Sequence, residues 1–154
     1  MNAADQDLAL VTGLYRTTNA TVRELDQRLS REFDITFIQA VTLLAIDSFE
    51  SPQPHLVADY LSQQSQTVTG VLDRLERAGH VERKRDLGDR RAVRLELTGS
   101  GRNLVNAMSG TLRQHIRDVL HGLTSDTRKN LREDLCELEQ SIRAIAADEQ
   151  HDGH

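Results

Sequence analysis

The sequence predicts a mainly α-helical protein with one small β-hairpin. Along most of the 154 residues, apolar positions recur every three or four residues, which is the period of a helix that buries one face. Between residues 81 and 97 the period changes to two, which is the period of strands. Aromatic residues make up only 3% of the chain, and so low a share disfavours a β-sandwich. The length fits a single domain over residues 1–154.

The first predicted helix, residues 5–33, carries a narrow apolar seam. Its members are spaced three and four residues apart: Leu8, Val11, Tyr15, Thr18, Val22, Leu25 and Leu29. A seam of this width is typical of a helix that packs along another helix. A second helix is expected to begin after Thr36, with Gln39 completing a capping box, and to run to about Phe49. Pro52 and Pro54 then end it, because proline has no N–H to donate.

Two shorter helices and the hairpin follow. The first is expected at residues 56–61, and the polar stretch 62–65 leads into the second, which closes at Ala78 and Gly79. Gly79 is suited to the left-handed conformation that ends many helices. The strands are expected at residues 81–85 and 92–97, around a turn that contains Gly88.

Two long helices complete the chain. One begins at residues 98–101 and is broken by Gly122, and the other begins near Ser125 and ends in a polar tail, 148–154, that is expected to fray. The last helix repeats the narrow seam: Leu131, Leu135, Leu138, Ile142 and Ile145. Seams this narrow do not suit fully buried helices. We therefore expect the regions 5–33 and 100–147 to pair with a second copy of the chain in a homodimer.

The charges are distributed unevenly along the chain. The formal net charge is −5, which alone disfavours binding to nucleic acid. Residues 83–94 nevertheless hold six basic and two acidic side chains, so this segment carries +4 and the remainder −9. A basic hairpin on an acidic body indicates a localised anionic partner. A solvated hairpin with scattered arginines is the alternative interpretation.

Residues 36–99 have the element order of a winged helix-turn-helix, in which short helices joined by a polar turn precede a β-hairpin. The helix that opens at residue 64 has apolar anchors at Val68, Leu72 and Leu75. Its opposite face offers amides, hydroxyls and an arginine, which can bond to base edges and phosphates in a major groove. An ordinary surface helix rich in Ser, Thr and Gln would have the same composition.

Four short motifs follow one another between residues 75 and 101. They are a Leu-Glu-x-x-Gly turn at 75–79, Arg83 in the next strand, an Asp-x-Arg wing at 89–91 and a closing Leu-Thr-x-x-Gly at 97–101. At these spacings the motifs resemble the signature of the MarR family of bacterial transcriptional regulators. The flanking helices match in number and order, so the resemblance covers nearly the whole chain. His80 is a departure, because the family usually has an aliphatic residue there.

The resemblance implies a homodimer whose two recognition helices enter successive major grooves of a palindromic double-stranded DNA operator, about 34 Å apart. By position, the residues that would contact bases or phosphates are Ser65, Gln66, Thr67, Thr69, Arg74, Arg90 and Arg91. Arg91 would reach into the minor groove, where A·T-rich DNA concentrates negative potential. Asp89 would brace the wing by pairing with a nearby arginine.

The resemblance also implies a repressor that leaves DNA when it binds a small ligand or is oxidised. An aromatic acid would bind near Tyr15, Arg16, Phe37 and His115, with Arg16 pairing with its carboxylate. A surface ion pair of Arg16, or no ligand at all, is the alternative. The family's peroxide sensors have a reactive cysteine in the first helix, whereas the single cysteine here, Cys136, is interpreted as inert. The histidines show no i, i+4 pair, so no metal site is expected.

The remaining features disfavour other classes of protein. The sequence has no Gly-rich phosphate loop, metal motif or Ser/His/Asp arrangement, so we expect neither enzyme activity nor a cofactor. The acidic N-terminus is unlike a signal peptide, and no apolar run approaches the roughly 18 residues of a membrane span. With a single cysteine, these features predict a cytoplasmic protein. The alternative function is a winged-helix module that binds protein instead of DNA, which the +4 hairpin disfavours unless the partner is acidic.

Overall fold

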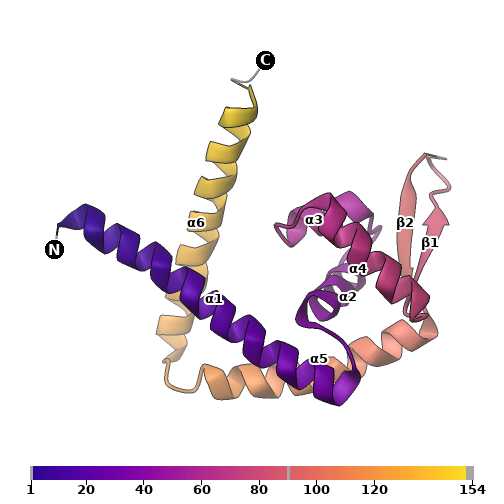
Figure 1. Cartoon of the computed structure of the whole chain (residues 1–154), viewed down its shortest axis with the longest axis horizontal. Coiled ribbons are helices and arrows are strands. Elements are labelled where there is room, and N and C mark those ends of the chain that lie inside the picture. The colour runs from indigo at the N-terminus through magenta and orange to yellow at the C-terminus, as the bar shows by residue number, and fades with distance from the viewer. Residues whose placement is uncertain (1, 90, 152–154) are drawn as a thin grey trace. The chain divides into compact units, whose positions relative to one another are not determined.

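The computed structural model describes residues 2–89 and 91–151, and these form helices and one two-stranded antiparallel sheet (Figure 1). In chain order the elements are α1 (Ala3–Phe33), α2 (Phe37–Ser48), α3 (Pro54–Tyr60), α4 (Ser65–Arg77), β1 (Val81–Arg85), β2 (Val93–Leu97), α5 (Gly99–Val119) and α6 (Ser125–His151). The described residues divide into two compact units, with the boundary between Leu112 and Arg113. The predicted fold class, mainly α with a small hairpin, is confirmed.

Local capping determines where α1 ends and α2 begins. Asp34 adopts the left-handed conformation, with a φ of 56°, and donates its N–H to the Ser30 carbonyl to end α1. Thr36 and Gln39 cap α2 reciprocally, because the side chain of each accepts a hydrogen bond from the N–H of the other. The Asp26 carboxylate accepts a hydrogen bond from the Phe37 N–H, so α1 also holds the start of α2.

The next two helices differ in how well their boundaries were predicted. α3 begins at Pro54, not at residue 56, because a proline at the first helical position needs no N–H partner. α4 ends as predicted, with Gly79 in the left-handed region at a φ of 81°. The N–H groups of Gly79 and His80 donate to the carbonyls of Glu76 and Leu75, both at 2.9 Å, which satisfies the last turn of the helix.

The hairpin is joined to the helices at its root. β1 and β2 pair with Val81 opposite Leu97 and Arg83 opposite Leu95. The Leu95 N–H donates to the Pro52 carbonyl at 2.8 Å, so the segment between α2 and α3 contacts the outer edge of β2. Val81, Leu95 and Leu97 are buried, which anchors this end of the hairpin in the core.

The core of the first unit holds α4 against its neighbours. Its largest fully buried side chains come from several elements: Leu29, Leu43, Val57, Leu72, Leu75, Leu95 and Met108. Burying one such side chain contributes about 1.5–3 kcal/mol. Figure 1 shows α2, α3 and α4 gathered beside the hairpin. The orientation of α4 is therefore fixed by packing.

The predicted break at Gly122 is confirmed, because α5 ends at Val119 and α6 begins at Ser125. Arg128 stabilises the break by donating to the carbonyls of Leu120 at 2.7 Å and Leu123 at 3.0 Å. α6 continues through residue 151, so the prediction of a frayed tail is wrong for residues 148–151. Alanine, glutamate and glutamine dominate residues 146–150, and these are strong helix formers. The rest of the predicted tail, 152–154, lies outside the described residues.

The apolar seams of α1 and α6 are exposed over much of their length. Leu25 and Leu29 of α1 are buried, whereas Leu8 and Tyr15 are 68% and 70% exposed. Leu131, Leu135, Ile142 and Ile145 of α6 are also exposed. Large exposed apolar patches are typical of surfaces that bind another molecule. Across the described ranges, no helix combines the length and the apolar character that crossing a bilayer requires.

Candidate nucleic-acid interface

α4 presents one polar face to solvent. Its apolar side chains Val68, Leu72 and Leu75 are at most 1% exposed and fix the helix in the core. The sequence-predicted contact residues on this helix are all exposed: Ser65, Gln66, Thr67, Thr69 and Arg74. No side chain caps the start of α4. Its first N–H groups are therefore free to interact with an anion such as a phosphate.

Arg83 of β1 joins the hairpin to α4. Its guanidinium donates to the Asp73 carboxylate at 2.8 Å and to the Glu76 carboxylate. Partial burial lowers the pKa of Arg83, but the hydrogen bonds to the two carboxylates outweigh that effect and raise it. From the sequence, Arg83 was recognised only as part of a motif. The spacing of Asp73 and Glu76 puts both carboxylates on one side of α4, but it does not indicate which cation they meet.

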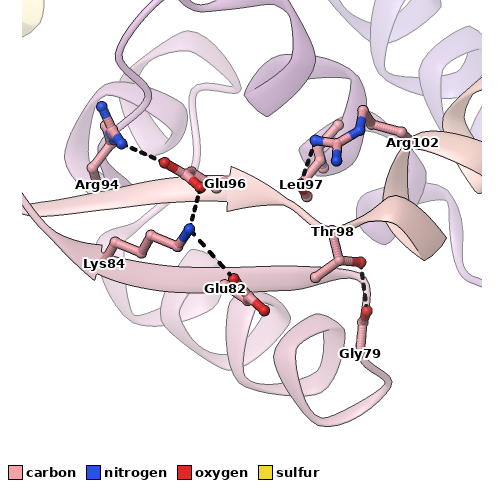
Figure 2. A network of polar contacts seen from close by, with 8 residues as sticks. All are labelled: Gly79, Glu82, Lys84, Arg94, Glu96, Leu97, Thr98 and Arg102. Atoms are coloured by element: carbon pink, nitrogen blue, oxygen red, sulfur yellow. Dashed lines mark hydrogen bonds and ion pairs between the residues drawn. The ribbon is translucent and has the colours of Figure 1, made fainter.

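A second set of ion pairs neutralises the middle of the hairpin (Figure 2). The Lys84 ammonium lies 2.6 Å from one Glu96 oxygen and 3.7 Å from Glu82, and the Arg94 guanidinium contacts the other Glu96 oxygen. Hydrogen bonds from Lys84 and then Arg94 hold the pKa of Glu96 below its usual range, and the same interaction with Glu96 raises the pKa of Lys84. These cations have partners within the hairpin.

Two exposed arginines lie near the distal end of the hairpin, beside Asp86 and Asp89. Arg85 and Arg91 are exposed, and neither guanidinium makes a hydrogen bond or ion pair with residues 2–89 or 91–151. The Asp89 carboxylate accepts a hydrogen bond from the Arg91 main-chain N–H at 2.9 Å. Asp89 therefore shapes this turn through the main chain, and the pair with an arginine side chain that the sequence predicts stays a prediction. Arg90 lies outside the described residues. Arg85 was absent from the predicted contacts.

The root of the hairpin is fastened to α5 by Thr98. The Thr98 hydroxyl donates to the Gly79 carbonyl at 2.6 Å and accepts from the Gly101 N–H at 3.0 Å, and the Thr98 N–H donates to the His80 carbonyl at 3.1 Å. Arg102 donates to the Leu97 carbonyl at 2.8 Å (Figure 2). A Cβ on Gly101 would overlap the His80 carbonyl, so only glycine fits there. These contacts explain the Leu-Thr-x-x-Gly motif physically.

The residues predicted to bind an effector come from three helices, α1, α2 and α5. Tyr15 and Arg16 line a surface hollow of about 570 Å³ along α1, together with Arg23. Phe37 is the half-buried first residue of α2, and His115 is a half-buried residue of α5 within the second unit.

The single cysteine and the metal-ligating side chains are the remaining candidates for a site. Cys136 is exposed on α6, with the Gln140 side-chain amide 3.7 Å from its sulfur. In the part of the chain that the structure describes, no three His, Cys, Asp or Glu side chains converge as metal ligands would.

Comparison with known proteins agrees with this geometry. The family model described as "MarR family" matches residues 33–92. The HTH-type transcriptional regulator TtmR of Methylorubrum extorquens is 31% identical to this chain, over 91% of this chain and 70% of its own length. The HTH-type transcriptional regulator PecS of Dickeya dadantii is 32% identical, over 90% of this chain and 85% of its own length. A crystal structure of a mutant E. coli MarR complexed with operator DNA matches with a TM-score of 0.78 and 25% identity, covering 90% of this chain and 99% of that one. This chain therefore belongs to the MarR family of DNA-binding transcriptional regulators.

Proposed function

We propose that this chain is a sequence-specific repressor that binds a palindromic DNA operator as a homodimer. One observation carries the proposal: Arg83 joins the exposed polar face of α4, through Asp73 and Glu76, to a hairpin that carries the exposed Arg85 and Arg91 near its distal end. A helix for the major groove and a charged hairpin beside it form a combination that reads duplex DNA. The solved E. coli MarR structure with operator DNA supports this interpretation.

In this proposal α4 reads the bases. Gln66 and Thr69 carry an amide and a hydroxyl, which can distinguish base pairs by their donors and acceptors in the major groove. Ser65, at the uncapped start of the helix, binds a phosphate, and the remaining contacts come from Thr67 and Arg74. All five side chains are exposed and therefore accessible to DNA without rearrangement of the core.

The hairpin supplies contacts that depend mainly on charge. Arg91 enters the minor groove, and Arg85, which alternates onto the same face of β1 as Arg83, binds the adjacent phosphates. Arg90 belongs to the same cationic end by sequence. Asp89 acts by holding the Arg91 main chain in place. The cations in the middle of the hairpin, Lys84 among them, contribute less because carboxylates already neutralise them.

The remaining parts of the chain serve assembly and control in this proposal. Residues 36–99 form the DNA-binding lobe, and residues 5–33 and 100–147 form the dimer through the exposed seams of α1 and α6. A small effector such as an aromatic acid binds near Tyr15 and Arg16 and releases the repressor from DNA. The protein acts in the cytoplasm, without catalysis, as its relatives' names as transcriptional regulators suggest.

A salt titration of DNA binding tests the proposal. The probes are a duplex that the wild-type protein selects from a randomised library and a scrambled version of it. Arg91→Ala should weaken binding to both duplexes and lower the salt slope by about 0.9 for each phosphate that the variant no longer neutralises. Gln66→Ala should cost about 1–3 kcal/mol on the selected duplex, with little change on the scrambled one.

Lys129→Ala removes one exposed charge from α6 and serves as the matched control, which should leave both affinities unchanged. If Arg91→Ala leaves the salt slope and both affinities untouched, the hairpin does not bind DNA. The protein-binding interpretation of the winged helix then replaces the proposal.

A further inference from the structure

Gly70 lies within α4 without any internal reason for a glycine. Its φ is not in the left-handed region, where Gly79 is found. A Cβ built on Gly70 would meet no atom within 4 Å, so packing inside the chain does not demand its absence. Glycine in a helix interior lowers stability relative to alanine. The chain thus carries a destabilising residue that neither backbone geometry nor packing explains.

The position of Gly70 on the helix indicates where the reason lies. At 100° per residue, Gly70 points away from the buried Val68 and Leu72 and into solvent. Gln66 lies one turn before it on the same side, and Arg74 one turn after it. Because Gly70 has no side chain, the main chain of α4 is uncovered at the centre of the exposed polar face.

We propose that Gly70 is the point of closest approach between α4 and duplex DNA. Without a Cβ, the main chain of α4 comes directly against the base edges of the major groove, and its neighbours Gln66 and Arg74 reach their partners. A side chain at this position would hold the whole helix away from the groove. The inference rests on the proposed function, and it adds a residue that determines specificity by its lack of a side chain.

Two substitutions that keep the helix test the inference. Gly70→Ala and Gly70→Leu both introduce better helix formers, so a loss of binding cannot come from unfolding. We expect Gly70→Ala to raise Tm by about 1–4 °C. On the duplex selected by the wild-type protein, Gly70→Ala should bind at least about tenfold more weakly, as removal of a good base contact does, and Gly70→Leu more weakly still.

Gly110→Ala is the matched control, because Gly110 is an exposed helical glycine of α5 whose added Cβ would also meet nothing within 4 Å. It should raise Tm in the same way and leave the affinity for the selected duplex within about twofold. If wild type binds the selected duplex and Gly70→Ala binds it within twofold of wild type, the inference is wrong while the proposed function stands. If the wild-type protein selects no duplex at all, the proposed function fails, and the inference with it.

Discussion

Replacing Gly101 with alanine should destabilise the fold, although alanine is the better helix former. Gly101 lies in the first turn of α5, against the turn that links α4 to β1. An added Cβ would overlap the His80 carbonyl oxygen and lie 3.0 Å from the carbonyl carbon. Carbon atoms in contact prefer a separation of about 3.5–4.0 Å. The turn at residues 79–80 must therefore move away from α5.

The loss of stability depends on the hydrogen bonds that this movement of the turn would break. The Thr98 N–H donates to the same His80 carbonyl at 3.1 Å, and the Thr98 hydroxyl donates to Gly79 at 2.6 Å. Overpacking costs about 1–3 kcal/mol, and the loss of each hydrogen bond about 0.5–1.5 kcal/mol. Alanine returns about 0.5–1 kcal/mol through its helix propensity. We expect a net loss of about 2–4 kcal/mol.

Gly99 offers a matched control in the same helical turn, because a Cβ there would meet nothing within 4 Å. In urea unfolding, Gly101→Ala should lower the free energy of unfolding. Gly99→Ala should leave the free energy of unfolding equal to that of wild type or raise it. Thermal unfolding should lower the Tm of Gly101→Ala by about 5–15 °C. Equal stability of the two variants would refute the described packing of α5 against the turn.

Three further predictions concern the charges and the seams. Arg83→Met should lower the free energy of unfolding by about 0.5–1.5 kcal/mol, a modest loss because its ion pairs are partly exposed, and urea unfolding checks it. In the folded protein the pKa of Glu96 is lowered by its ion pairs. Glu96 therefore stabilises the fold at pH values above its ordinary pKa, and this stabilisation is lost as the pH falls through the pKa of the folded state. The difference in free energy of unfolding between wild type and Glu96→Gln should therefore vanish on acidification. An equal difference at neutral and acid pH would contradict this prediction. Leu135→Asp combined with Leu138→Asp should give monomers or insoluble protein by light scattering, whereas a wild-type monomer at micromolar concentration would rule out the dimer.

The elements that could be predicted from the sequence are those with local signals. Thr36 and Gln39 lie three residues apart, and Gly79 needs only its own backbone freedom, so both helix ends were found correctly. The start of α3 was missed because Pro54 was interpreted as ending one helix when it begins the next. Leu95 reaches the Pro52 carbonyl through a long-range hydrogen bond that no sequence window contains.

The candidate site shows the same division between local and long-range information. Periodicity identified the exposed face of α4, because burial of one helix face is a property of the helix alone. The partners of Arg83 could not be read in this way, since Asp73 and Glu76 belong to another element and meet it only after folding. The bonding of Asp89 to the main chain likewise depends on the conformation of the turn.

Counting charges in the segment 83–94 overstated how much of the hairpin can attract DNA. The count left out Glu82 and Glu96 at its borders and the two carboxylates of α4, and these neutralise Arg83, Lys84 and Arg94. These ion pairs leave the two strands nearly neutral, and residues 85–91, which hold three arginines and two aspartates, keep a net charge of +1. Exposed charges interact over about 10 Å at 0.1 M salt, so under the proposed function these arginines attract only the phosphates near the end of the hairpin. Under the proposed function, affinity from charge comes from the hairpin and discrimination between bases from α4, and Arg83 links the two elements through Asp73 and Glu76.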